Sequence, residues 1–306
     1  MLKEICITPQ VFDNHNLLAD LNWKDIKHLL EAIGNGGYIL GLHNQEWIKT
    51  TLQNISVLES EKIKDRFVSI FKFLQDRNRI VGHPKGDINP KNEEDWLKIA
   101  YELNEIREFH TILATNKYRE NILCIEELED IYISEKFGIS GSHPYIKTDE
   151  KLEKIFLPLL SYAKKVTVID PYFDISERRY KESLKLIAKC FKERRGSKEK
   201  GSIAINCSSK ISPNEEWKKI LDNIFQKYGH VVTINIWEDN KKMHDRYIIT
   251  NQFGIQIGSG LDIGDKESEF SVLDFSTLDK HLQKFNENSS PFTLKYSVTA
   301  AGVKKK

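Results

Sequence analysis

This sequence lacks cysteine clusters, metal-binding motifs and long apolar runs. The four cysteines are widely scattered, at Cys6, Cys124, Cys190 and Cys207. No Cys-x-x-Cys pair or Cys/His cluster is present, which excludes the usual zinc motifs, and the spacing does not fit a disulfide framework. No segment approaches the length of a membrane-spanning helix, and Met1–Glu4 lacks the apolar run of a signal peptide. We therefore expect a soluble, intracellular protein of the cytoplasm.

A large net charge is also missing, because the formal charge at pH 7 is only +1 over 306 residues. The balance hides an asymmetry. Residues 149–306 hold 28 Lys and Arg against 22 Asp and Glu, whereas residues 1–148 hold 18 against 23. Three of the surplus positive charges are the terminal Lys304-Lys305-Lys306, which is typical of a solvated tail. The mildly basic second half is compatible with a polyanionic partner but does not require one.

The first part of the chain, residues 1–134, has the pattern of a helix-rich α/β domain. Short apolar runs predict strands at Lys3–Thr8, Tyr38–Leu42 and Ile122–Ile125. Helical patterns cover 23–33, 45–56, 59–79 and 93–114. We expect Asn22 to cap the first helix and the glycines from Gly34 to end it. An all-helical domain is the alternative if the short apolar runs are helix ends.

Residues 135–148 contain Gly138, Gly141 and Pro144 and are typical of a linker. In residues 149–306, apolar strands alternate with helical patterns, which predicts a parallel or mixed sheet covered by helices on both faces. Strands are expected at 166–170, 202–206, 231–236, 244–258 (a hairpin) and 270–275, and helices near 149–163, 176–194, 214–228 and 277–286. Because ligands of such sheets gather at the carboxyl ends of strands, Asp170 is a candidate site residue.

The segment from His244 to Gly260 carries the residues that most clearly suggest a chemistry. His244 and Arg246 stand two residues apart, so on a strand they share one face. The hairpin returns to a turn of small residues, Gly258-Ser259-Gly260. A nucleophile or acid, a fixed cation and a closely approaching backbone are the parts of a phosphodiester site. The alternative is a buried hairpin that happens to carry both side chains.

This segment resembles the signature of the phospholipase D superfamily, a His-x-Lys pair followed by Asp and then Gly-Ser-x-Asn. His244, Arg246 and Asn251 occupy the first three places and Gly258-Ser259 the next, with every spacing kept. The resemblance implies that His244 attacks phosphorus and that Arg246 holds the phosphate oxygens, without a metal or other cofactor. The sequence departs from the signature, with arginine for lysine, asparagine for aspartate and Leu261 for the last asparagine. Arginine can still hold a phosphate through two bonds.

A closer resemblance is to the MIT C-terminal domain, a degenerate phospholipase D-like branch. It rests on His244-Asp245-Arg246, on the turn Gly258–Asp262 and on Asp170-Pro171-Tyr172 after an apolar strand, and it covers about residues 149–288. In that branch the fold is a binding module, so the resemblance supports the fold more firmly than catalysis. Asp245 and Asp262 flank the site, where they could orient His244 or bind a divalent ion.

The superfamily site uses two histidines, but this chain carries one such motif. The resemblance therefore implies that an active enzyme is a homodimer in which each copy gives one His244. His230 and His281 lack a comparable motif, and we expect His230 at a helix end and His281 at the surface or a rim. An active His244 should be accessible at the strand ends, within hydrogen-bonding reach of an acid.

The first half has one competing signal. The segment from Arg77 to His83 resembles the short Arg…His motif of HEPN ribonucleases, which implies that both side chains act on the RNA 2′-hydroxyl and phosphate. The strand-like runs around it fit a four-helix HEPN fold poorly, and a loop histidine is the alternative.

Three functions follow from these features. The leading hypothesis is a phospholipase D-like phosphodiesterase or nuclease, a hydrolase that binds nucleic acid. Its fusion to an N-terminal domain in a lysine- and asparagine-rich chain is similar to bacterial phage-defence and restriction modules. The second is a non-catalytic module that binds phosphate or a partner protein within an antiviral defence complex. The third is a HEPN-type ribonuclease toxin.

Overall fold

A computed structural model describes residues 2–19, 22–43, 45–83, 87–106, 109–119, 122–128, 142–192, 201–238, 243–286 and 288–305. The chain divides into two compact units, Leu2–Ile139 and Ser140–Lys306. Each unit has its own sheet. Within the part of the chain that the structure describes, every helix falls short of the length or the apolarity that a membrane crossing requires.

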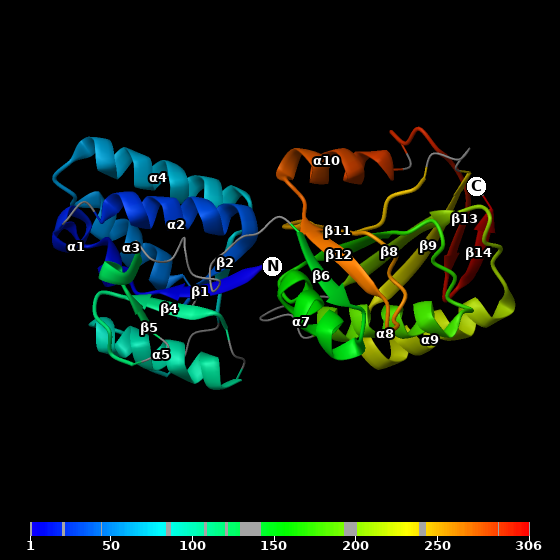
Figure 1. Cartoon of the computed structure of the whole chain (residues 1–306), viewed down its shortest axis with the longest axis horizontal. Coiled ribbons are helices and arrows are strands. Elements are labelled where there is room, and N and C mark those ends of the chain that lie inside the picture. Colours follow the sequence, from blue (N-terminus) through cyan, green and yellow to red (C-terminus); the bar gives the residue numbers. More distant parts are fainter. Residues whose placement is uncertain are drawn as a thin grey trace. The chain divides into compact units, whose positions relative to one another are not determined.

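The first unit is built on a parallel sheet with the strand order β3-β2-β1-β4-β5. Its strands are β1 (Lys3–Ile7), β2 (Gly37–Gly41), β3 (Ile80–Gly82), β4 (Thr111–Ala114) and β5 (Ile122–Cys124). Its helices are α1 (Asn14–Leu18), α2 (Trp23–Gly36), α3 (Glu46–Ser56), α4 (Glu61–Asp76) and α5 (Glu93–Ile106), with short 3-10 turns at η1 (Pro9–Phe12) and η3 (Ile125–Glu127). Figure 1 shows α2 and α4 on one side of the sheet and α5 on the other. The expected α/β class is confirmed, and the all-helical alternative is wrong.

Two local predictions for this unit are corrected, and one strand was missed. The helix expected over 93–114 ends at Ile106, and Thr111–Ala114 is the fully buried strand β4, because an apolar run of four residues suits a central parallel strand as well as a helix end. Strand β3 was not predicted. Asn22 is itself helical in backbone conformation and makes no side-chain cap.

Gly34 does not end α2, which continues to Gly36. A Cβ at Gly34 would lie 2.6 Å from the ring of Phe73 on α4, so the glycine permits close packing of the two helices. The helix still ends within the glycine run that was expected to stop it, with Gly37 directly after its last residue. Gly34 itself marks a packing contact.

The second unit is built on a mixed sheet with the order β14-β13-β9-β8-β7-β10-β11-β12-β6. Its strands are β6 (Ser142–Ile146), β7 (Lys165–Ile169), β8 (Ser202–Ser208), β9 (Val231–Glu238), β10 (Tyr247–Thr250), β11 (Gly254–Ile257), β12 (Glu267–Val272), β13 (Thr293–Thr299) and β14 (Gly302–Lys305). Strands β7, β8 and β9 are parallel, and the pairs on either side of them are antiparallel. The predicted mixed sheet is confirmed.

Helices α7 (Asp149–Leu160), α8 (Arg178–Lys192) and α9 (Glu215–Tyr228) lie on one face of this sheet, and α10 (Phe275–Lys284) lies on the other (Figure 1). Alternating apolar residues of the parallel strands, such as Val168, Ile205 and Ile234, are buried on the three-helix side. Three helices therefore cover one face of the sheet and a single helix covers the other. The alternation of strands and helices in the sequence does not predict this difference.

Both ends of this unit differ from the expected organisation. The segment 135–148, expected as a linker, contains β6, which pairs along its whole length with β12. Its part before residue 142 lies outside the described residues. Lys304 and Lys305, expected in a solvated tail, are exposed residues of the edge strand β14. Pro144 and the lysines are the residue types that a sheet edge tolerates, so composition alone gives the wrong structure for them.

Candidate functional site

Chain segments far apart in sequence meet at the carboxyl end of β7. Strand β10 runs antiparallel to β7, with Tyr247 opposite Ile169. The residues just before β10 therefore come next to Asp170, which directly follows β7. His244 and Arg246 precede the strand, and the interpretation that they lie on it is corrected. The parallel strands place this group at the edge where such sheets bind ligands.

Asp170 is the buried centre of this group, with none of its surface exposed. Its two carboxylate oxygens accept hydrogen bonds from the backbone N–H groups of Tyr172 and Leu261, each at 3.0 Å. The Arg246 Nε lies 3.9 Å from Oδ1. Burial raises the pKa of Asp170, the two backbone hydrogen bonds and the Arg246 charge oppose that rise, and Asp262 adds to it. Asp170 thus ties β7 to the turn that follows β11.

Arg246 is held on several sides but is not enclosed. Its Nη1 donates to the carbonyl of Gly258 at 3.2 Å, and its guanidinium lies 5.3 Å from the ring centre of Tyr172. Its side chain remains 23% exposed, next to the fully buried carboxylate of Asp170. A planar guanidinium oriented in this way keeps donors available for a ligand oxygen.

A second ionic group surrounds Asp262, at the end of the same turn. Lys147 pairs with its Oδ1 at 2.5 Å, and Arg179 pairs with its Oδ2 at 3.3 Å. The Lys147 side chain is 2% exposed and also donates to the carbonyl of Gly260 at 3.3 Å. Sequence reasoning missed Lys147 and Arg179, since neither stands in a motif and only the fold brings β6 and α8 to this turn.

His244 is exposed at the same edge, as the accessibility expectation requires. Among the residues that the structure describes, its ring makes no hydrogen bond or ion pair, so the expected acid partner is not found there. Asp245 is exposed beside it. His244 therefore lies two residues before Arg246, with its side chain open to solvent.

Asn251 does not join this group. It follows β10, whereas His244 and Arg246 precede it, and its side-chain oxygen accepts a hydrogen bond from the backbone N–H of Lys164 at 3.0 Å. The motif spacing is kept, but the four residues of β10 carry Asn251 to the opposite edge of the sheet. The interpretation of Asn251 as part of a shared catalytic cluster is therefore corrected.

The small-residue turn accepts a hydrogen bond from Arg246 at the Gly258 carbonyl. The N–H groups of Gly258 and Ser259 are not free to bind a ligand. The Gly258 N–H donates to the carbonyl of Glu269 at 2.9 Å, and the Ser259 N–H donates to the hydroxyl of Ser268 at 3.0 Å. Gly260 has φ of +99°, in the region that L side chains rarely adopt. The predicted direct phosphate contact of the Gly258 and Ser259 backbone is corrected: these donors are used inside the protein.

The two other histidines examined from sequence are both buried. His230 follows Gly229, the left-handed residue that ends α9, and packs on Phe191 with ring centres 4.5 Å apart. His281, on α10, was expected at the surface or a rim, but it is buried and its ring packs at a tilt against that of Tyr247, with ring centres 4.1 Å apart. Neither histidine is placed to act with His244 within one copy of the chain.

The HEPN interpretation of Arg77 and His83 is wrong at the level of the fold. Arg77 ends α4 and packs on the ring of Phe73 at 4.3 Å, and β3 separates it from His83. His83 is buried, and its backbone N–H donates to the carbonyl of Gly41 on β2. The motif therefore lies in a parallel sheet, whereas the HEPN motif requires a helical bundle.

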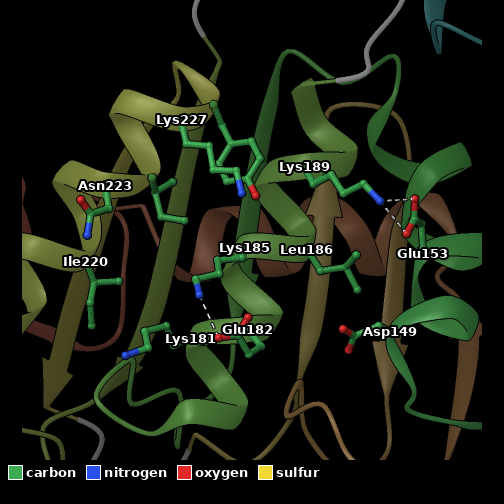
Figure 2. Close-up of a pocket in the computed structure, with 12 residues that line it drawn as sticks. Asp149, Glu153, Lys181, Glu182, Lys185, Leu186, Lys189, Ile220, Asn223 and Lys227 are labelled. Atoms are coloured by element: carbon green, nitrogen blue, oxygen red, sulfur yellow. Dashed lines mark hydrogen bonds and ion pairs between the residues drawn. The ribbon is translucent and has the colours of Figure 1, made fainter.

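A groove lies along α8, between α7 and α9 (Figure 2). Lys181, Lys185 and Lys189 stand four residues apart along α8, and Lys227 faces them from α9. A second hollow, lined by Arg178 and Arg179, adjoins the groove, since both are lined by Asp149 and Glu182. The floor is formed by apolar side chains, Leu186, Ile220 and Ile224. Arg179 thus connects the cluster at Asp262 with a row of lysines.

The described residues contain no group of three or more His, Cys, Asp or Glu that could hold a metal ion. The fold and the site define a class, an α/β domain whose buried aspartate and partly open arginine meet at the carboxyl ends of parallel strands. Residues 150–289 match the family model of the phospholipase D-like domain at the C-terminus of MIT. This segment is therefore a phospholipase D-like domain of that family.

Other comparisons add little. No curated protein matches the chain. A solved structure of TrmBL2, described as an archaeal chromatin protein with a novel mode of DNA binding, aligns over 88% of this chain and 92% of its own. The aligned residues are 15% identical and the TM-score is 0.30, so this likeness carries no argument about fold or ligand.

Proposed function

We propose that the phospholipase D-like domain binds phosphodiester groups of a nucleic acid at Arg246. The observation that carries the proposal is the guanidinium itself, which Asp170, Tyr172 and the Gly258 carbonyl hold in place while part of it stays open to solvent. A fixed arginine fork matches the geometry of phosphate oxygens. Exposed His244 stands beside it as a further donor.

The ionic groups of the cluster are balanced in charge. Lys147, Arg179 and Arg246 face three carboxylates, those of Asp170, Asp262 and Glu177, and Glu177 pairs with Arg179 at 2.7 Å. Because burial raises the pKa of Asp170, protonation of that carboxyl would leave one positive charge in excess as the pH falls. Recognition of an anion therefore rests on the open donors of Arg246 and not on a net charge of the cluster.

The lysine row on α8 favours a polymer over an isolated phosphate. Lysines at successive positions i and i+4 are about 6 Å apart along the helix axis, so the row continues the basic side chains from Arg179 along one face of α8. Lys185 and Lys189 pair with Glu182 and Glu153, as Figure 2 shows. Such exposed pairs contribute little stability, so a phosphate backbone can replace the glutamates as partners.

Fluorescence anisotropy with a labelled single-stranded oligonucleotide tests the proposal. Arg246→Gln should weaken binding about tenfold, because the bidentate contact is lost. Lys304→Gln, which removes one exposed charge on β14, is the matched control and should leave affinity within about twofold. Equal affinities of the wild type and Arg246→Gln would contradict the proposal.

A second candidate function is phosphodiester hydrolysis, and the position of His244 favours it. The side chain is exposed, stands where the family signature places the nucleophile and has no partner among the described residues. Because one copy supplies one such histidine, this function requires a homodimer. His244→Ala should abolish cleavage of DNA, RNA or a simple phosphodiester while binding largely survives. A protein that is strictly monomeric in sedimentation yet active would contradict the dimeric mechanism.

Absence of cleavage with retained Arg246-dependent binding would assign the domain to the non-catalytic class. A place in a bacterial defence complex, with a partner protein, stays a prediction made from the domain combination.

A further inference from the structure

The sheet face under α10 is only partly covered. Ile169 and Trp237 of this face are apolar and pack on α10. The cross-strand neighbours farther from that contact are small or polar: Thr167 opposite Ala204, Ala204 opposite Thr233, and Asn206 opposite Asn235. A face buried beneath a full helical layer would carry apolar residues at these positions. Part of this sheet face therefore has no helix of the described chain packed on it and is open to a ligand.

Next to α10 this face forms a cavity of about 450 Å³, in the size range of small-molecule sites. Leu282 and Phe285 of α10 line one side, and Ala204 lies on the sheet side. Thr250 and Asn251 line the edge beyond β10. The cavity therefore lies beyond the opposite end of β10 from His244 and is separate from the Arg246 cluster.

The floor and wall of the cavity are fixed by internal contacts. Buried Asn206 donates to the Val168 carbonyl at 3.3 Å and accepts from the Trp237 indole N–H at 2.8 Å. Phe285 packs edge-on against Trp237, with ring centres 6.0 Å apart, and stacks on Phe292 at 5.5 Å. A site ordered before binding loses less conformational entropy when a ligand enters.

Spare hydrogen-bond donors line the cavity. Thr167 is 6% exposed, and within the described ranges its hydroxyl has no hydrogen-bond partner. Lys165, two residues earlier on the same face, has no ion-pair partner in the part of the chain that the structure describes. The Asn251 side chain uses its oxygen for Lys164 and keeps its amide NH₂ available.

Among the described residues that line this cavity there is no aspartate or glutamate. The combination of one cation, a hydroxyl, an amide NH₂ and an aromatic wall suits a ligand with an anionic head and a flat apolar body. We propose that this cavity binds a small organic anion, with its carboxylate or phosphate at Lys165, Thr167 and Asn251 and its apolar part against Leu282 and Phe285.

Titration calorimetry of the full chain tests this site with three compounds that share one ring. Benzoate and phenyl phosphate should bind, and the comparison of the two separates a carboxylate site from a phosphate site. Benzylammonium carries the opposite charge on the same ring and should not bind. Lys165→Gln and Thr167→Val should each weaken binding of the better anion about fivefold to tenfold.

Lys164→Gln is the matched control, because it removes the neighbouring charge without changing a residue that lines the cavity. If Thr167→Val fails to fold, Lys165→Gln still tests the proposal, because Lys165 is exposed and tolerates substitution. Arg246→Gln removes the proposed phosphate donor of the other site, so Lys165-dependent binding of the anion that persists in this variant distinguishes the two sites. Absence of saturable binding of both anions at about 10 mM, or equal loss in Lys164→Gln and Lys165→Gln, would overturn the proposal.

Discussion

At the scale of single residues, Asp170 links structure and ligand binding most closely. It is fully buried, and its two oxygens satisfy the backbone N–H groups of Tyr172 and Leu261. The same carboxylate lies beside Arg246. One side chain therefore fixes the turn after β11 and orients the cation at which we place the phosphate.

Asp170→Asn should destabilise the second unit by about 1–3 kcal/mol. Asparagine offers one oxygen in place of two, and its NH₂ would face a backbone N–H that now lacks an acceptor. Urea unfolding, followed by tryptophan fluorescence, measures the change. Asp265→Asn, an exposed carboxylate in the same region, is the control and should change stability by less than about 0.5 kcal/mol.

His281 gives a prediction about pH. Burial lowers its pKa, Lys284 and Lys280 lower it further, and Asp245 opposes them. The folded state therefore favours the neutral ring, so the stability that it contributes is present above the unfolded value of about 6.5 and is lost as the pH falls. His281→Phe keeps a ring against Tyr247 but removes the proton.

The urea midpoint of the wild type should consequently fall more between pH 7 and pH 5 than that of His281→Phe. Parallel pH profiles of the two proteins would show that His281 has no such role.

Several decisive residues of the site could be predicted from sequence, and the reasons for the failures are physical. His244, Arg246, Asp170 and Asp262 were all candidates, because motif spacing and strand ends are visible in a sequence. Lys147 and Arg179 were not, since their partner Asp262 is more than 80 residues away. Asn251 was misplaced, because residue spacing does not report which end of a strand a side chain occupies.

At the scale of elements, the turn Gly258–Asp262 organises the site. It receives Arg246 at the Gly258 carbonyl, Asp170 at the Leu261 N–H and Lys147 at the Gly260 carbonyl. The chain reverses at Gly260 with φ of +99°. A small displacement of this turn would therefore move three ionic contacts together.

Gly260→Ala should destabilise the unit by about 1–3 kcal/mol and weaken binding at Arg246. The added Cβ would be strained at this φ and would lie 3.2 Å from Asp262 Oδ1 and 3.5 Å from Arg246 Nε. Gly264→Ala is the control, because a Cβ there meets nothing within 4 Å. Denaturation and oligonucleotide binding would both be measured, and similar behaviour of the two variants would contradict this role of the turn.

Elements were predicted best where their pattern is long and periodic. The parallel strands and the helices between them in 149–306 follow from alternating apolar runs. The edge strands β6 and β14 were missed, because edge strands carry polar and charged residues that do not mark a buried face. Strand β13, between β14 and β9, was also missed, since most of its residues are only partly buried. In the first unit, β3 and β4 are short runs whose strand identity depends on their neighbours in the sheet.

At the scale of the whole molecule, the chain forms two compact units, each built on a sheet of its own. The second unit holds the phospholipase D-like domain and both proposed ligand sites. The first unit is a parallel α/β sheet for which the HEPN interpretation is withdrawn. The α/β class of both follows from composition and patterning, whereas the order of the strands follows only from three-dimensional pairing.

The central claim is that Arg246 contacts the phosphate of a nucleic acid. The most direct measurement is an NMR titration of the ¹⁵N-labelled full chain with a short single-stranded oligonucleotide, following the Arg246 Nε–H signal. We predict that this signal and the backbone N–H signals of Tyr172 and Leu261 shift together and saturate with the Kd seen by anisotropy. Saturable binding that leaves the Arg246 signal unchanged would contradict the claim.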